Sequence, residues 1–169
     1  MILITGGSKS GRSGLAEDML CSYQGKKIYI ATMQNDCDEA AYTIERHLRM
    51  RDGKGFDTIE CPYDINKADI PPHCAVLVED AVNLLANEMF AAGAPEPVQK
   101  AALELKELDM RCDMLIVVTS QTGCDGQKLG ELTDRYTSYL GHLNRMLCEI
   151  SDTVIESVYG IPVILKERI

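Results

Sequence analysis

Short apolar runs alternate along the chain with longer stretches in which apolar residues recur every three or four positions. Runs of about four to eight apolar, β-branched residues are typical of buried strands, and the longer recurrence is typical of helices with one buried face. Strands are expected at 2–5, 26–32, 56–61, 74–80, 114–119, 153–158 and 161–165. Helices are expected from near residue 11 and over 38–51, 81–92, 96–110 and 129–150.

This alternation predicts an α/β fold with a mainly parallel sheet and helices on both faces. The runs 2–5, 74–79 and 114–119 are the most continuously apolar, so we place them at the centre of the sheet, covered on both faces. Tyr159-Gly160 joins the last two strands, which predicts a C-terminal hairpin. The last helix is expected to bury one face, which consists of Leu132, Tyr136, Tyr139, Leu143, Met146 and Leu147. With no obvious linker, the 169 residues are expected to form one domain.

The acidic composition narrows the range of partners. A net charge of −9 argues against nucleic acid or a membrane surface as partner, since both attract basic proteins. No apolar run reaches the roughly 18 residues that span a bilayer, and the first strand starts at residue 2. We therefore expect no secretory signal, no membrane span and a cytoplasmic protein. The seven cysteines form no C-x-x-C pair, which favours reduced thiols over zinc ligands.

The segment between the first strand and the first helix carries the clearest chemical signal. It contains Gly6, Gly7, Ser8, Lys9, Ser10, Gly11, Arg12 and Ser13. This order follows the phosphate-loop pattern G-x-x-x-x-G-K-[ST], except that Arg12 stands where lysine is usual. Such a loop surrounds a phosphate with backbone amides, and the Ser13 hydroxyl would bind Mg²⁺. An ordinary Gly/Ser turn between a strand and a helix is the alternative.

Two further segments carry candidate chemistry. The apolar strand at 74–79 ends in Glu79, and a carboxylate at that position could hold Mg²⁺ together with Ser13. This signal is weak alone, because many buried strands end in an acid. The expected helix at 38–51 carries a cationic cluster around a single histidine: Arg46, His47, Arg49 and Arg51. A neutral imidazole there is a competent nucleophile toward phosphorus, and Arg49 or Arg51 could stabilise the developing phosphate charge.

Six stretches occur in one order: MILITGGSKSGRS, KKIYIAT, DEAAYTIERHLRMR, TIE, AVLVEDAVNLLANEMF and GHLNRMLCEISDTVIESVYGIPVILK. Together they resemble the bifunctional adenosylcobinamide kinase / adenosylcobinamide-phosphate guanylyltransferase family of cobalamin biosynthesis. The resemblance covers essentially the whole chain. It implies a P-loop NTPase (RecA-like) fold, a homotrimer, GTP or ATP as substrate and a corrinoid acceptor. It also implies two reactions: phosphorylation of an acceptor hydroxyl, and GMP transfer through a GMP-histidine intermediate.

The resemblance assigns roles to single residues. The histidine of the family pattern R-I-x-x-H falls on His47, with Thr43 in place of the arginine and Ile44 matching. The family's nucleotide-binding positions outside the phosphate loop fall on Ala31, Thr32, Met33, Glu60 and Glu79, and Arg51 of the cationic cluster is a further nucleotide-binding candidate.

Several family residues differ in this chain. Arg12 replaces the loop lysine, and Ser120-Gln121 replaces an Asn-Glu pair after the fifth strand. In the last helix, Asp134 and Ser138 stand where an arginine and an aspartate are usual. These departures fall where chemistry is expected, and the guanylyl-transfer half looks better preserved than the kinase half. Two other interpretations stay open: a family member that binds nucleotide or corrinoid without turnover, and a small kinase with an unrelated acceptor.

Overall fold

The computed structural model describes residues 1–34, 42, 45, 49, 52–122 and 130–168. The strands are β1 (Ile2–Thr5), β2 (Lys26–Ala31), β3 (Phe56–Glu60), β4 (Cys74–Glu79), β5 (Met114–Val118), β6 (Thr153–Val158) and β7 (Ile161–Glu167). The helices are α1 (Arg12–Leu20), α3 (Ala81–Phe90), α4 (Pro97–Asp109) and α5 (Glu131–Ile150), with a 3₁₀ turn η1 (Ile65–Lys67). No helix in these ranges is long and apolar enough to cross a bilayer.

The seven strands form one sheet in the order β3-β2-β4-β5-β1-β6-β7, and only the β6–β7 pair is antiparallel. The three runs placed at the centre from their apolar character, β4, β5 and β1, are the three central strands, so that prediction is confirmed. Their side chains are almost entirely buried, because helices cover both faces. The predicted C-terminal hairpin is confirmed as well.

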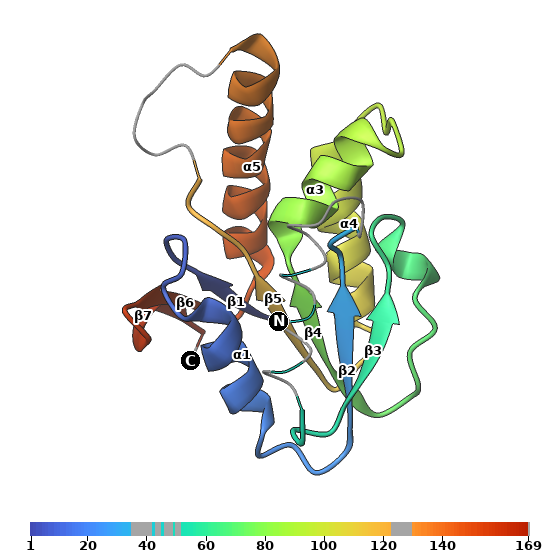
Figure 1. Cartoon of the computed structure of the whole chain (residues 1–169), viewed down its shortest axis with the longest axis vertical. Coiled ribbons are helices and arrows are strands. Elements are labelled where there is room, and N and C mark those ends of the chain that lie inside the picture. The colour runs from blue at the N-terminus through green and yellow to red at the C-terminus, as the bar shows by residue number, and fades with distance from the viewer. Residues whose placement is uncertain (35–41, 43–44, 46–48, 50–51, 123–129, 169) are drawn as a thin grey trace.

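Helices form a layer on each side of this sheet (Figure 1). On one face, Ala16 and Leu20 of α1 pack with alternate residues of the central strands, such as Leu77 and Ile116. On the other face, α3, α4 and α5 pack with the remaining strand residues, such as Val76 and Val117. The result is the expected three-layer α/β architecture.

The prediction of which residues of the last helix are buried is partly wrong. Leu132 is 61% exposed, whereas Leu140, which we did not include, is buried beside Leu143 and Leu147. The first turns of α5 extend beyond the sheet edge, so apolar residues there meet no sheet surface (Figure 1). Of the expected helix at 38–51, Tyr42, Glu45 and Arg49 are helical and exposed, and its other residues lie outside the described ones.

One partly buried ion network joins α3, α4 and the turn at η1. The Lys100 ammonium on α4 lies 2.6 Å from Asp64 Oδ1 and 3.2 Å from Glu104 Oε1, and it also donates to Glu88 Oε1. Glu88 is fully buried on α3. Burial disfavours the charged ammonium, but its bonds to the three carboxylates outweigh this and raise the pKa of Lys100. The bond from Lys100, and next the bond from Lys67, lowers the pKa of Asp64 to about 2.

We expect Lys100→Met to lower the free energy of unfolding by roughly 3–5 kcal/mol, because it leaves buried carboxylates without their cation. Lys106→Met, on the exposed side of the same helix, is the control and should change it by less than about 0.5 kcal/mol. Urea unfolding of both variants measures the difference. Equal stability of the two variants would show that the network contributes nothing.

Candidate nucleotide site

The predicted site residues converge on one edge of the sheet. Parallel strands end at the same edge of a sheet, and the predicted site residues lie at the ends of β1, β2, β3 and β4 or directly after them. Ala31 at the end of β2 pairs in register with Glu60 of β3 on one side and with Glu79 of β4 on the other. Three segments far apart in sequence therefore meet at the carboxyl edge, where α/β proteins bind ligands.

The phosphate loop connects β1 to α1 in a conformation that needs glycine at two positions. Gly6 and Gly11 have φ of 149° and 92°, in the region that L side chains rarely adopt. A Cβ at Gly6 would lie 2.7 Å from the Ser157 carbonyl oxygen, and one at Gly11 would lie 3.2 Å from Gly160 Cα. The backbone is thus packed directly against the β6–β7 hairpin.

The hairpin also bonds to the loop. The Ser10 carbonyl oxygen accepts hydrogen bonds from the Gly160 amide and the Ser157 hydroxyl, both at 2.8 Å. Gly11 caps α1 without a side-chain bond, so the first amides of this helix have no side-chain acceptor at the cap. These amides and the positive end of the helix dipole are the elements that bind a phosphate group.

Ser13 and Glu79 lie together beneath the loop. The Ser13 hydroxyl donates to Glu79 Oε1 at 2.6 Å, and Glu79 Oε2 is buried with no hydrogen-bond partner among the described residues. Burial, and next the charge of Asp80, raise the pKa of Glu79 to about 8; the Ser13 bond and the charge of Arg12 act in the opposite direction. A hydroxyl beside an unsatisfied carboxylate oxygen is an oxygen donor set that suits Mg²⁺.

Arg12 does not project freely from the phosphate loop. Its guanidinium donates to the Thr119 carbonyl oxygen, at the end of β5. The residues that follow also contact the loop: the Gln121 amide donates to the Gly6 carbonyl at 3.3 Å, and the buried Ser120 hydroxyl lies 3.5 Å from the same oxygen. Ser120 and Gln121 therefore support the phosphate loop.

Thr32 lies in the interior of the site and supports its backbone. It is fully buried, and its hydroxyl oxygen lies 2.9 Å from the Glu79 and Asp80 carbonyl oxygens and accepts from the Asp80 amide at 2.7 Å. It thereby holds the backbone that carries Glu79. Ala31 and Met33 are half-buried on either side of Thr32, and Glu60 is exposed.

Two predicted residues, His47 and Arg51, lie outside the described ones. Of the cationic cluster, Arg49 is described; it is exposed and forms an i,i+4 ion pair with Glu45.

Sequence reasoning missed two supporting residues, Asn87 on α3 and Asn144 on α5. Asn87 donates to the carbonyl oxygens of Thr32 and Pro62, and Asn144 bonds to Thr119 and Ser120. Neither belongs to a recognisable motif. Their only signal was a polar residue beside apolar positions of an amphipathic helix.

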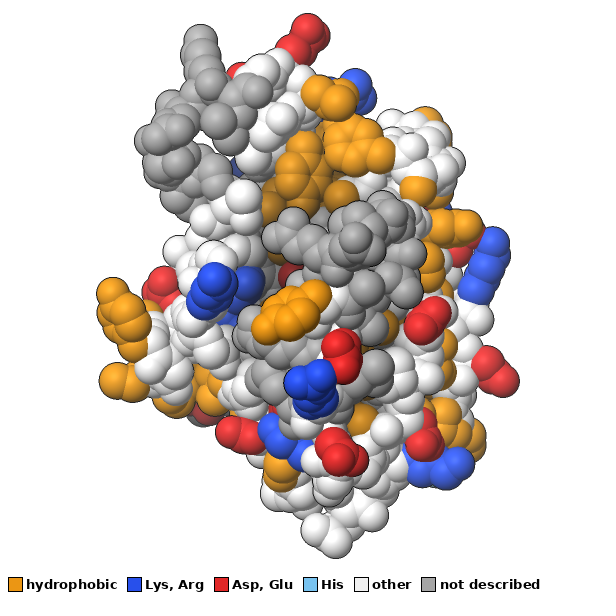
Figure 2. Space-filling view, in the orientation of Figure 1, with side chains coloured by type: hydrophobic (Ala, Val, Ile, Leu, Met, Phe, Trp, Pro, Cys, Tyr) orange, Lys and Arg blue, Asp and Glu red, His pale blue; other side chains and the backbone are white. Residues whose placement is uncertain are grey.

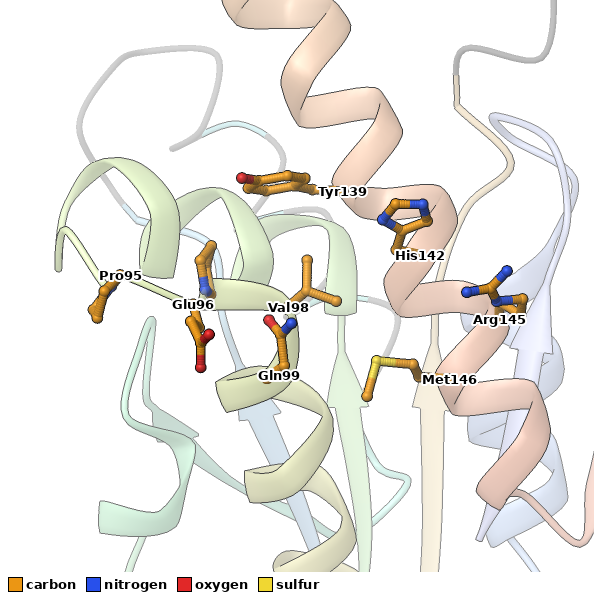
Figure 3. Close-up of a pocket in the computed structure, with 9 residues that line it drawn as sticks. Pro95, Glu96, Val98, Gln99, Tyr139, His142, Arg145 and Met146 are labelled. Atoms are coloured by element: carbon orange, nitrogen blue, oxygen red, sulfur yellow. The ribbon is translucent and has the colours of Figure 1, made fainter.

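A separate cavity of about 350 Å³ opens between α4 and α5 (Figure 3). Tyr139, His142 and Arg145 project from α5, and the first turn of α4 with Val98 and Gln99 forms the opposite wall (Figure 3). None of the predicted site residues that the structure describes lines this cavity. The candidate nucleotide site is therefore the carboxyl edge of the sheet.

Comparison with known proteins agrees with this geometry. Residues 2–165 match the sequence model of the family described as cobinamide kinase / cobinamide phosphate guanyltransferase. The bifunctional adenosylcobalamin biosynthesis protein CobU of Salmonella typhimurium is 32% identical, over 98% of this chain and 99% of that protein. CobU of Escherichia coli is 29% identical, over 98% of this chain and 99% of that protein. The bifunctional protein CobP of Pseudomonas aeruginosa is 32% identical over 97% of this chain and 96% of its own.

Proposed function

The chain belongs to the cobinamide kinase / cobinamide phosphate guanyltransferase family, and we propose that it acts on a corrinoid in cobalamin biosynthesis, in the cytoplasm, as a single nucleotide-binding domain. The observation that carries the proposal is the pairing of Ser13 with Glu79 beneath a phosphate loop at the carboxyl edge of the sheet. The bifunctional names of the relatives support two transfers, of phosphate and of GMP.

In the first transfer, an acceptor hydroxyl attacks the γ-phosphorus of GTP or ATP. The new O–P bond forms as the bond to the β-phosphate oxygen breaks, and the nucleoside diphosphate leaves with the hydroxyl proton released. Phosphoryl transfer depends mainly on positioning and charge. The loop from Gly6 to Ser13 supplies backbone amides for the phosphates, and Arg12 supplies positive charge.

In the second transfer, His47 attacks the α-phosphorus of GTP, an N–P bond forms and pyrophosphate leaves. The ring loses its second nitrogen proton to solvent. A phosphate oxygen of the phosphorylated corrinoid then attacks the same phosphorus, the N–P bond breaks, and the ring takes a proton back from solvent, which regenerates neutral His47. Arg51 is proposed to bind the nucleotide from the same segment as His47, and Ala31, Met33 and Glu60 from the ends of β2 and β3, with the predicted residue Thr32 buried behind them and holding their backbone.

We propose that Ser13 and Glu79 hold Mg²⁺ when nucleotide is bound. The donor set fits, because both groups offer oxygen and one carboxylate oxygen of Glu79 is buried without a partner among the described residues. A bound Mg²⁺ would neutralise phosphate charge. Glu79 would then be ionised, since a nearby cation opposes the effect of burial on its pKa.

A second candidate function is nucleotide or corrinoid binding without turnover. The observation in its favour is the bond between Arg12 and the Thr119 carbonyl, which directs the loop cation toward β5. Arginine is planar and fork-shaped, so it does not reproduce the compact charge of lysine in a phosphate loop.

We expect His47→Ala to abolish covalent labelling by GTP that carries the label on its α-phosphate, while nucleotide affinity stays within about tenfold. A nucleophile contributes more to the chemical step than to ground-state binding. The label on the parent protein should be acid-labile and base-stable, as a phosphoramidate is. His142→Ala, at an exposed site on α5, is the matched control and should label normally. A parent protein that never labels would favour the binding-only function.

Arg12→Lys is expected to raise phosphoryl transfer to adenosylcobinamide by about tenfold, or roughly 1.4 kcal/mol in barrier, and to change GMP transfer less. Lysine would free the loop cation from Thr119 and present a compact charge to the β- and γ-phosphates. Lys106→Arg, at an exposed cation of α4 outside the loop, is the control and should change neither rate. The two rates are measured separately with GTP and each acceptor. Equal changes in both would contradict this role for Arg12.

The assembly is proposed to be a homotrimer, with the segment of His47 near a neighbouring subunit. Support for an interface of some kind comes from β7, an edge strand whose Ile161, Ile164 and Leu165 are 65%, 59% and 56% exposed. Uncovered apolar side chains on a sheet edge favour association. In Figure 2, hydrophobic side chains project from this hairpin side of the molecule.

Light scattering at micromolar concentration is therefore expected to give three times the chain mass. Replacing Ile164 and Leu165 by lysine should reduce that mass, because it charges the exposed edge. Met110→Lys, which charges a residue 73% exposed at the end of α4, should leave it unchanged. A monomeric parent protein would exclude the trimer.

A further inference from the structure

Two asparagines reach the carboxyl edge of the sheet from the same helical layer. Asn87 lies on α3 and Asn144 on α5, and both are half-buried. Each carboxamide bonds to the backbone or side chains of segments that directly follow strands. Backbone carbonyl groups beyond the end of a strand have no partner in the next strand. The two asparagines provide the hydrogen bonds that these groups need.

Asn87 joins the ends of β2 and β3. Its Nδ2 donates to the Thr32 carbonyl oxygen at 2.7 Å and to the Pro62 carbonyl oxygen at 2.9 Å. Both donors of the amide group are therefore used. Thr32 directly follows Ala31, and Pro62 lies two residues beyond Glu60; Ala31 and Glu60 are register partners. One side chain thus fixes both strand ends that carry the non-phosphate part of the candidate site.

Asn144 holds the end of β5 in a similar way. Its Oδ1 accepts from the Thr119 hydroxyl at 2.6 Å, and its Nδ2 donates to the Ser120 carbonyl oxygen at 2.9 Å. The Thr119 carbonyl is the acceptor of Arg12, and the Ser120 hydroxyl lies against the Gly6 carbonyl. Asn144 therefore fixes the segment on which the phosphate loop rests.

The sheet order separates the two regions. From β1, where the phosphate loop begins, three strand intervals lead across β5 and β4 to β2. At about 4.8 Å per interval this is roughly 14 Å, so phosphates at β1 place the nucleoside of an extended nucleotide toward β2 and β3. Among the described residues, no hydrogen bond joins the Asn87 group directly to the Asn144 group. β4 lies between them, and Thr32 bonds to the Glu79 backbone rather than to its carboxylate.

We propose that Asn144 and Asn87 are positioning residues that hold the phosphate half and the nucleoside half of the nucleotide site separately. The inference rests on the proposed nucleotide-binding function and adds that each asparagine supports a different half of the site. Replacing either asparagine by aspartate keeps the shape of the side chain. It also removes the NH₂ donors and can place a carboxylate oxygen against a carbonyl oxygen, which displaces the segment that the amide held.

The test compares binding of two probes, Mg²⁺-GTP and Mg²⁺-tripolyphosphate, to the full chain by calorimetry. Tripolyphosphate reports on the phosphate half alone. Asn87→Asp should weaken GTP binding by about tenfold or more and leave tripolyphosphate binding within about threefold. Asn144→Asp should weaken both probes by about tenfold or more. Gln99→Glu makes the same amide-to-acid change at an exposed position of α4 and should alter neither.

Several outcomes would overturn the proposal. Equal weakening of both probes by Asn87→Asp would indicate a general structural defect, and unchanged GTP binding would show that Asn87 positions nothing. A parent chain that binds GTP but not tripolyphosphate would show that the halves do not act separately. If an aspartate variant fails to unfold cooperatively, Asn87→Ala and Asn144→Ala replace it and should give the same pattern with smaller changes. A parent chain that does not bind GTP contradicts the proposed function itself.

Discussion

A parallel sheet covered on both faces leaves all of its carboxyl ends at one edge, where backbone carbonyl groups have lost their ladder partners. Burying such groups without hydrogen bonds is costly, so side chains from the neighbouring segments must bond to them. In this protein the bonds come from Thr32, Asn87, Asn144 and Arg12. The same edge receives the phosphate loop and Glu79. The side chains that bond to the strand ends therefore also shape the nucleotide site.

The phosphate loop has support from two sides. The β6–β7 hairpin packs against Gly6 and Gly11 and bonds to the Ser10 carbonyl, while the end of β5 contacts Gly6 and Arg12. The loop can therefore keep its amides aimed at a phosphate before any ligand binds. Such preorganisation is what transfer reactions require, because stabilising charge must be in place when the reaction occurs. The hairpin consequently contributes to the site from the far end of the chain.

The position of Arg12 gives a physical meaning to the departure from the phosphate-loop pattern. The usual lysine is a compact charge that reaches phosphate oxygens. Arg12 is long enough to bond to the Thr119 carbonyl while its charge still acts on Glu79. Ser120 and Gln121, which follow β5, both contact Gly6. Arg12, Ser120 and Gln121 thus form one contiguous group around the loop, so the loop and its support have to be considered together.

The sequence by itself determined the α/β class, the three central strands, the C-terminal hairpin and the residues of the phosphate loop. These follow from local patterns, since a continuously apolar run needs cover on both faces and the glycine spacing permits only certain turns. Only the tertiary structure decided that Glu79 accepts from Ser13, that Arg12 bonds to Thr119, and that Asn87 and Asn144 hold strand ends. It also decided that Leu132 is exposed, because α5 extends past the sheet. These contacts join residues 24 to 107 positions apart or depend on where an element ends in space, and no periodicity in the sequence records either.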